Sequence, residues 1–129
     1  MAMQKVLVVE DTKEIASLVK FKLLSAGFEV TVAEDGRRGL ELAGEIVPDL
    51  IVMDVMMPVM NGLETLMNLK NDRKLRAIPV ILLTAQSTEQ EIVRGLEIGA
   101  EDYITKPFSP QELLVRVKIV LARPKRSTF

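Results

Sequence analysis

The chain has 129 residues, of which 48% are hydrophobic and 27% are charged, a composition typical of one globular domain. It contains no cysteine and no histidine, which excludes disulfides, thiolate or histidine catalysis, and metal sites built from these residues. With a formal net charge of −1, 4% aromatic residues and no tryptophan, the chain offers no surface suited to nucleic acid, and we expect no direct nucleic-acid binding.

The first half of the chain predicts alternating strands and helices. In chain order we expect a strand at 5–9, a helix capped by Asp11 or Thr12 and ended by Gly27, a strand at 29–33, a short helix at 39–44 and a strand at 50–53. The first strand is an uninterrupted aliphatic run, which is typical of a strand buried on both faces. The inward face of the first helix is predicted to be Ile15, Leu18, Val19 and Leu23.

The second half continues the alternation. We expect a helix at 63–70, a strand at 79–84, a helix capped by Ser87 or Thr88 and closed by Gly99, a strand at 102–104 and a helix with Pro110 in its first turn. This last helix is predicted to bury Leu113, Val117, Val120 and Leu121. Residues 123–129 are polar and include Pro124, so we predict one domain over residues 1–122, followed by the start of a linker.

Strand–helix alternation of this kind predicts the α/β class, with a doubly wound five-stranded parallel sheet and helices on both faces. Five strands in a chain of this length suit the flavodoxin-like strand order 2-1-3-4-5. In that architecture ligands bind at the carboxyl ends of the strands, at the switch point between strands 1 and 3.

Polar side chains stand at the ends of four predicted strands. Glu10 and Asp11 follow the first strand, Asp54 ends the third, Thr84 ends the fourth, and Lys106 follows the fifth. Because the carboxyl ends of parallel strands share one edge of the sheet, we expect these groups to lie together. Three carboxylates in one place repel one another, and a hard divalent cation relieves the repulsion. Mg²⁺, which binds oxygen ligands and keeps several waters, is the expected ion.

Carboxylates, an ammonium, a hydroxyl and a metal suit phosphoryl transfer, with Asp54 as the best candidate nucleophile and an acyl phosphate as its product. Each residue also has a structural explanation. An aspartate at a strand end often caps a helix, and an acidic pair is often a solvated surface. Composition and spacing therefore leave both a phosphate site and a coincidence open.

Five segments carry a more specific signal. They are Val8-Val9-Glu10-Asp11, Asp54-Val55-Met56-Met57-Pro58 with Asn61-Gly62, Leu83-Thr84-Ala85, Gly99-Ala100, and Asp102-Tyr103-Ile104-Thr105-Lys106-Pro107-Phe108. In this order they resemble the receiver domain of bacterial two-component response regulators, over a stretch from about residue 5 to residue 121. The stretch 94–113 is most similar to the OmpR/PhoB subfamily.

The resemblance implies a signalling switch that assists its own phosphorylation and dephosphorylation, and not a conventional enzyme. Asp54 matches the residue that accepts the phosphoryl group from a sensor histidine kinase. Thr84 and Lys106 match the hydroxyl and the ammonium that bind the phosphoryl group. Tyr103 matches the aromatic residue that swings inward once Thr84 moves to the phosphate, and the Lys106–Pro107 bond is expected to be cis.

For the metal, the resemblance implies Mg²⁺, with Mn²⁺ as the alternative ion. Asp11 matches the direct ligand, Glu10 a ligand acting through water, and Met56 the position that lends its backbone carbonyl beside Asp54. Glu10 departs from the family pattern, in which Asp is commoner, but its longer side chain should still reach a metal-bound water. Met56 and Gln86 match positions that tune hydrolysis, and because an apolar Met56 cannot orient a water, we expect a long-lived phosphoryl group.

The resemblance also implies a homodimer through the predicted fourth helix, fifth strand and fifth helix. Such a face would be self-complementary across a two-fold axis. It is expected to offer Val93, Leu96 and Leu114 as an apolar patch, with Glu101 and Asp102 opposite Arg116 and Lys118 of the other copy.

Three other functions compete with the phosphorylated switch. A receiver-like module that only binds proteins would lack Asp54 or Lys106, and both are present. A haloacid-dehalogenase-like phosphatase needs a second acid two residues after its nucleophile, where this chain has Met56. A flavodoxin is disfavoured because Glu10 and Asp11 would repel the phosphate of the flavin.

No apolar run approaches the roughly 20 residues that a membrane-spanning helix needs. The first nine residues are too short and wrongly flanked for a signal peptide. We therefore expect a cytoplasmic location and no membrane partner.

Overall fold

The computed structural model describes residues 3–85 and 89–124, and in these ranges five strands alternate with five helices. The strands are β1 (Lys5–Val9), β2 (Glu29–Ala33), β3 (Leu50–Asp54), β4 (Val80–Thr84) and β5 (Asp102–Thr105). The helices are α1 (Lys13–Ser25), α2 (Gly36–Ile46), α3 (Gly62–Lys70), α4 (Glu89–Ile98) and α5 (Pro110–Ala122). The predicted caps Ser87 and Thr88, position 86 and residues 125–129 lie outside the described residues.

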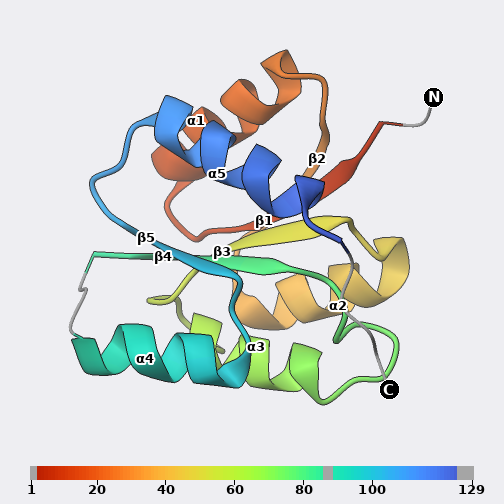
Figure 1. The fold of residues 1–129 in the computed structure, drawn as a ribbon, viewed down its shortest axis with the longest axis vertical. Coiled ribbons are helices and arrows are strands. Elements are labelled where there is room, and N and C mark those ends of the chain that lie inside the picture. Colours follow the sequence, from red (N-terminus) through yellow and green to blue (C-terminus); the bar gives the residue numbers. More distant parts are fainter. Residues whose placement is uncertain (1–2, 86–88, 125–129) are drawn as a thin grey trace.

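The strands form one sheet in the order β2-β1-β3-β4-β5, and every neighbouring pair is parallel. Helices α1 and α5 cover one face of the sheet, and α2, α3 and α4 cover the other (Figure 1). This arrangement confirms the predicted doubly wound α/β fold. Within the described ranges, no helix has the length and apolar character needed to cross a bilayer.

Two apolar layers hold the helices on the sheet. Successive side chains of a strand point to opposite faces, so β1 sends Leu7 and Val9 into the layer beneath α2 and α3. Val6 and Val8 enter the layer beneath α1 and α5. All four side chains are buried, and each contributes about 1.5–3 kcal/mol by leaving water. The sheet is therefore rigid on both sides of the edge where β1 and β3 end.

Helix α1 differs from the sequence prediction in one residue. Ala16, Val19 and Leu23 are buried and Ile15 is partly buried, but Leu18 is 49% exposed. Leu18 precedes Val19 by one position, about 100° around the helix, so it cannot share the stripe that faces the sheet. The prediction that Leu18 belongs to the core was wrong.

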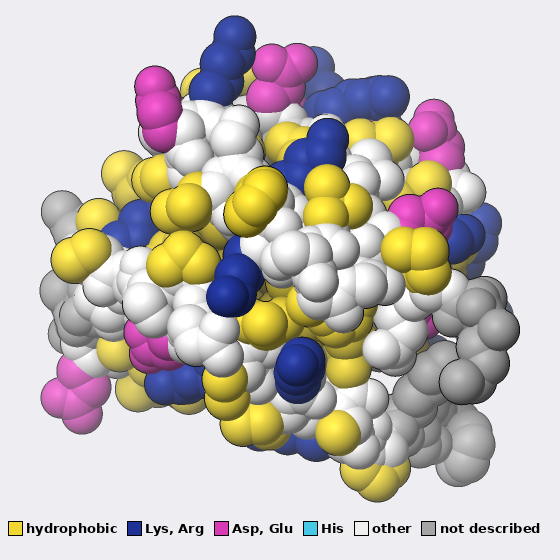
Figure 2. Space-filling model, turned by 90° about the horizontal axis from the view of Figure 1, so that it is seen from above, with side chains coloured by type: hydrophobic (Ala, Val, Ile, Leu, Met, Phe, Trp, Pro, Cys, Tyr) yellow, Lys and Arg dark blue, Asp and Glu magenta, His cyan; other side chains and the backbone are white. Residues whose placement is uncertain are grey.

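The side of the molecule covered by α1 and α5 carries a gathering of apolar side chains among lysines and arginines (Figure 2). The exposed large apolar residues of these two helices are Leu18, Phe21, Leu24, Val115 and Ile119. Such a patch is typical of a surface that contacts other proteins.

Helix α2 is longer than the segment 39–44 that the sequence predicts. The side chain of Asp35 caps the helix by accepting a hydrogen bond from the Arg38 N–H, 2.8 Å away. A Cβ on Gly36 would collide with the Met60 carbonyl oxygen and the Thr65 hydroxyl, so the missing side chain lets α2 approach the start of α3. The Asp35-Gly36 pair therefore starts α2 three residues before the predicted segment.

Candidate functional site

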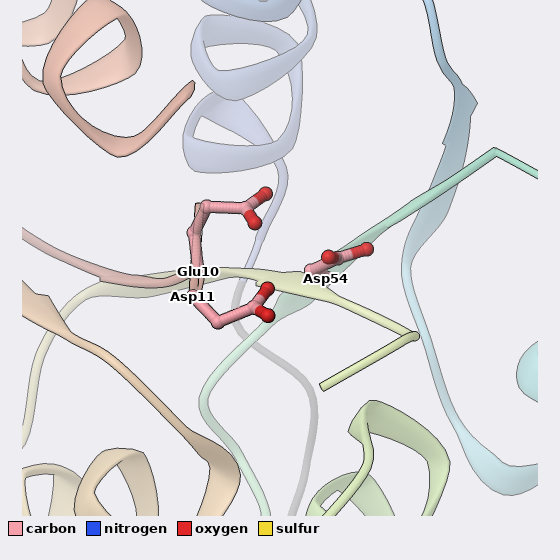
Figure 3. Close-up of side chains that lie close together, drawn as sticks. All are labelled: Glu10, Asp11 and Asp54. Carbon is pink, nitrogen blue, oxygen red and sulfur yellow. The ribbon is translucent and has the colours of Figure 1, made fainter. Parts of the chain in front are cut away.

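Three carboxylates meet where β1 and β3 end. Glu10 and Asp11 follow β1, and Asp54 is the last residue of β3, which is the neighbour of β1 in the sheet. One oxygen from each side chain lies within 4.8 Å of the others (Figure 3). Glu10 and Asp54 are buried, whereas Asp11 is exposed. The structure confirms that these residues lie together.

Lys106 supplies the cation of this cluster. Its Nζ lies 3.1 Å from Glu10 Oε1 and 3.2 Å from Asp54 Oδ2, although 96 residues separate it from Glu10 along the chain. Burial acts to lower the pKa of Lys106, but the Glu10 and Asp54 carboxylates outweigh it and hold the pKa above its ordinary value. Lys106 is therefore positively charged beside Asp54 at neutral pH.

Glu10 is bound on both of its oxygens. Oε1 accepts from Lys106, and Oε2 accepts a hydrogen bond from the Thr12 N–H at 3.1 Å. Burial raises the pKa of the Glu10 carboxyl, the Thr12 N–H lowers it, and the charge of Asp54 raises it again, so that the net direction is upward. Thr12 is the N-cap residue of α1, but its side chain makes no capping hydrogen bond.

Thr84 and Tyr103 lie on β4 and β5. Thr84 is fully buried at the end of β4, and its carbonyl oxygen accepts a hydrogen bond from the Lys106 N–H at 2.6 Å. Tyr103 is half-buried, and its hydroxyl oxygen is buried with no hydrogen-bond partner among residues 3–85 and 89–124. Burial raises the pKa of Tyr103, with a lowering effect from the Thr84 side chain and a raising effect from Glu91. The ring is therefore turned inward in this structure.

Met56 lies on the loop that follows β3, and its side chain is 63% exposed. The only oxygen that Met56 has to offer a metal is its backbone carbonyl, as the family resemblance implies. The Lys106–Pro107 peptide bond is cis, which confirms the prediction.

The loop between β3 and α3 is held by close backbone contacts that the sequence analysis did not predict. A Cβ on Gly62 would collide with the Asp54 carbonyl oxygen, and the Gly62 N–H donates to the Val55 carbonyl oxygen at 2.8 Å. Asn61 and Glu64 form a capping box at the start of α3. Sequence reasoning used Asn61-Gly62 only for the family resemblance and as a mark of a loop, although the spacing to Glu64 could have revealed the box. These contacts fix the backbone of Asp54.

A cavity of about 270 Å³ opens beside the cluster. Its walls include the carboxylates Glu10 and Asp11 and the cations Lys13 and Arg38. Glu34 adds a third carboxylate to its wall, so the cavity reaches the cluster from the side of β1 and β2.

Comparisons with known proteins agree with this geometry. The family model of the response regulator receiver domain matches residues 6–118. The chain is 46% identical over 120 residues to the phosphate regulon transcriptional regulatory protein PhoB of Escherichia coli, covering 93% of this chain and 52% of that protein. It is 43% identical to the alkaline phosphatase synthesis transcriptional regulatory protein PhoP of Bacillus subtilis, covering 93% of this chain and 49% of that protein. The chain thus spans about half the length of these curated relatives.

Solved structures show the same fold. The chemotaxis protein CheY4 of Vibrio cholerae superposes with a TM-score of 0.88 at 36% identity, covering 92% of this chain and 99% of that chain. A response regulator from Chloroflexus aurantiacus gives a TM-score of 0.89 at 34% identity, covering 95% of this chain and 100% of that chain. Fold, site geometry and family match agree: this chain belongs to the response regulator receiver domain family.

Proposed function

We propose that this domain is a phosphorylation-activated signalling switch that accepts a phosphoryl group on Asp54 from a sensor histidine kinase. The observation that supports this most directly is the pairing of Asp54 Oδ2 with Lys106 Nζ at 3.2 Å, next to two further carboxylates. Asp54 is held by a rigid, fully buried strand, so its carboxylate is fixed in place before the phosphoryl group arrives.

The proposed reaction is transfer to a carboxylate. An oxygen of Asp54 attacks the phosphorus, the bond from phosphorus to the donor breaks, and the electron pair leaves with the donor, giving an acyl phosphate. Lys106 binds one phosphoryl oxygen with its ammonium, and the Thr84 hydroxyl donates to another. Both groups neutralise charge that moves onto the phosphoryl oxygens.

The same cluster is proposed to hold Mg²⁺, with Mn²⁺ as the alternative. Its oxygen donors are the Glu10, Asp11 and Asp54 carboxylates and the Met56 carbonyl, which fit a hard divalent cation. Three carboxylates face one ammonium, so the cluster carries unbalanced negative charge. Asp11 is the exposed member and suits direct binding, whereas Glu10 already binds Lys106 and suits contact through water. The ion would supply charge neutralisation for the phosphoryl oxygens.

Two observations favour this function over its competitors. A module that only binds proteins has no need for a buried aspartate paired with a lysine, a combination this chain retains at Asp54 and Lys106. A phosphatase of the haloacid-dehalogenase type needs an acid at the position of Met56, whose side chain cannot donate a proton.

Incubation with acetyl phosphate and Mg²⁺, followed by intact mass measurement, tests the proposal. A stable adduct of one phosphoryl group that disappears in Asp54→Asn supports it. An unchanged mass would indicate a binding module, and acetyl phosphate consumption without an adduct would indicate a phosphatase. An adduct mapped to Glu10 or Asp11 in the wild type would contradict the assignment of Asp54.

A homodimer through α4, β5 and α5 is part of the proposal, with one correction. Val93 and Leu96 are exposed on α4, as predicted. Leu114 is only 7% exposed, because α5 turns it into the layer under α1 and α5, so it is not part of the patch.

Three charged residues of this face, Glu101, Asp102 and Arg116, already have partners within the chain. Arg116 Nη1 lies 3.0 Å from both carboxylate oxygens of Asp102, and Arg123 Nη1 lies 3.6 Å from a Glu101 oxygen. In a dimer, these side chains must either keep their partners within the chain or exchange them for partners in the other copy. Such exposed ion pairs set the register of the two copies more than they add to the affinity.

Sedimentation with and without beryllofluoride tests the dimer. We expect a tighter dimer with the mimic, and its loss in Leu96→Asp. Phe21→Asp on α1 is the matched control, since Phe21 is the most exposed residue of the patch on α1 and α5. Loss of the dimer in the Phe21 variant alone, or an intact activated dimer in Arg116→Glu, would show that the other face is used.

We also infer that residues 1–122 form the receiver domain of a longer transcription regulator and that a linker starts at residue 123. Helix α5 ends at Ala122, and the relatives named transcriptional regulatory proteins are about twice as long. A chain ending at residue 122 should fold and form the Asp54 adduct at the same rate as the 129-residue chain. A slower rate would place the boundary further along.

A further inference from the structure

Gly95 is the one buried residue of α4, a helix that the structure describes throughout. It faces β4 and the edge strand β5, where Leu82 of β4 and Tyr103 of β5 are paired neighbours. A Cβ at position 95 would lie 3.1 Å from Leu82 Cδ1 and 3.1 Å from Tyr103 Cε2. The absent side chain thus leaves a notch that the Tyr103 ring fills.

The two neighbours of this notch differ in how far they can move. Leu82 is completely buried, with 0% of its surface accessible to solvent. It packs within the layer beneath α2, α3 and α4. Tyr103 stands on the edge strand and is only half-buried, so its ring can rotate toward solvent. A methyl group at position 95 would press equally on both side chains, and Tyr103 is the one with room to yield toward solvent.

Two opposing effects act on the inward position of Tyr103. Its hydroxyl oxygen is buried without a hydrogen-bond partner in the described part of the chain, which opposes this orientation. Packing of the ring in the notch acts in the other direction, since tightly packed atoms gain dispersion energy. The contact with Gly95 therefore adds to the packing against the core that holds the ring inward.

We propose that Gly95 is a positioning residue that keeps Tyr103 turned inward and thereby sets how readily the domain changes its α4–β5–α5 face. This inference rests on the proposed switch and deepens it. Gly95 acts through Tyr103, while the reaction at Asp54 involves groups at the end of β3 and after β5. Adding a methyl group at position 95 should leave phosphorylation intact and weaken its consequence.

The chain contains a matched control for this substitution. Gly44 also lies within a helix, and a Cβ there would have no atom within 4 Å. Gly44→Ala and Gly95→Ala both gain helix propensity, but only the second meets a tyrosine ring. The chain has one tyrosine and no tryptophan, so tyrosine fluorescence reports on Tyr103 alone.

The experiment is quenching of this fluorescence by iodide in the wild type and both variants, each confirmed as folded by circular dichroism. We expect quenching to rise at least twofold in Gly95→Ala and to stay unchanged in Gly44→Ala. Equal quenching in Gly95→Ala and the wild type would overturn the proposal. A rise in both variants would do so too, because it would show a general effect of the substitution.

A measurement on the wild type keeps the proposal testable if Gly95→Ala does not fold. The ring protons of the single tyrosine should give nuclear Overhauser effects to the α-protons of Gly95. Their absence in a folded wild-type sample would contradict the notch.

The phosphorylation assay separates this inference from the proposed function. We expect Gly95→Ala to form the acetyl phosphate adduct at the wild-type rate and to lose the tightening of the dimer with beryllofluoride. An adduct rate lowered tenfold in Gly95→Ala alone would contradict a role limited to Tyr103. If the wild type forms no adduct, the proposed function fails, and the quenching comparison still decides whether Gly95 positions Tyr103.

Discussion

Lys106 Nζ lies 3.2 Å from Asp54 Oδ2 and links the end of β3 to the loop after β5. The same nitrogen contacts Glu10 after β1, so one ammonium holds two buried carboxylates from neighbouring strands. A third strand joins them, because the Lys106 N–H donates to the carbonyl oxygen of Thr84 at the end of β4. Lys106 thus connects the ends of β1, β3 and β4, which carry the other groups of the proposed phosphoryl transfer.

Replacing Lys106 with glutamine should destabilise the domain and slow its phosphorylation. Loss of the charge leaves two buried carboxylates unbalanced, and we expect the free energy of unfolding at neutral pH to fall by about 2 kcal/mol. Loss of a phosphoryl-binding group should lower the rate of adduct formation about 10²-fold. Urea denaturation and timed intact mass measurements check the two effects.

The double variant Lys106→Gln, Asp54→Asn is the control for this prediction. Removing the Asp54 charge relieves the repulsion with Glu10, so part of the lost stability should return. A double variant as unstable as Lys106→Gln would show that Lys106 stabilises the fold by another route.

Metal binding should depend more on Asp11 than on Glu10. Asp11 is exposed and suits direct binding, whereas Glu10 is held by Lys106 and the Thr12 N–H. We expect Asp11→Asn to weaken Mg²⁺ binding at least tenfold, an effect of about 1.4 kcal/mol, and Glu10→Gln to weaken it less. Isothermal titration calorimetry measures both constants. The reverse order would assign direct binding to Glu10.

The domain should lose stability in alkaline solution. Tyr103 and Lys106 both have a pKa raised in the folded protein, above their ordinary values of 10.0 and 10.5. In this range the folded chain keeps protons that the unfolded chain releases, so unfolding is favoured as the pH rises. The stability is fully present below the ordinary values and is lost as the pH passes through the raised ones.

Absorbance of the tyrosinate form gives the Tyr103 midpoint directly, because the chain has no second tyrosine. We expect a midpoint above 10.0. Urea denaturation across the same range should show a shallower loss of stability in Tyr103→Phe. A wild-type midpoint at or below the ordinary value would contradict burial of the hydroxyl.

Val59 should be a site where substitution stabilises the protein. It adopts φ 71°, a left-handed conformation that is strained for a β-branched residue, and the Met60 N–H donates to the Pro58 carbonyl oxygen across it at 2.8 Å. Val59 is 65% exposed, so its side chain adds little packing. Val59→Asn should raise the free energy of unfolding by about 1 kcal/mol in urea denaturation.

Val115→Asn is the matched control, since Val115 is exposed within α5 and has ordinary helical geometry. It should lose stability through its lower helix preference and lost apolar contact. A gain in both variants would show that backbone strain at Val59 is not the cause.

Periodicity and strand ends were enough to predict the fold and the meeting of Glu10, Asp11, Asp54 and Lys106. The buried run of β1 and the helix signals at Gly27 and Pro110 are local, because each depends on residues close in the chain. The meeting of Glu10 with Asp54 follows from topology, since parallel strands end at one edge. The roles of Thr84 and Tyr103 as a pair came from the family resemblance, because neither side chain is unusual at a strand end.

Other features depended on which surfaces pack against each other. Helix α1 has two apolar stripes, and only its contact with the sheet decides that Val19 is buried and Leu18 is not. In the same way α5 turns Leu114 inward, and the notch at Gly95 exists because β4 and β5 bring Leu82 beside it. A sequence pattern specifies how the side chains of one helix are spaced around its axis. Which of these side chains face the core is decided by the elements that pack against the helix.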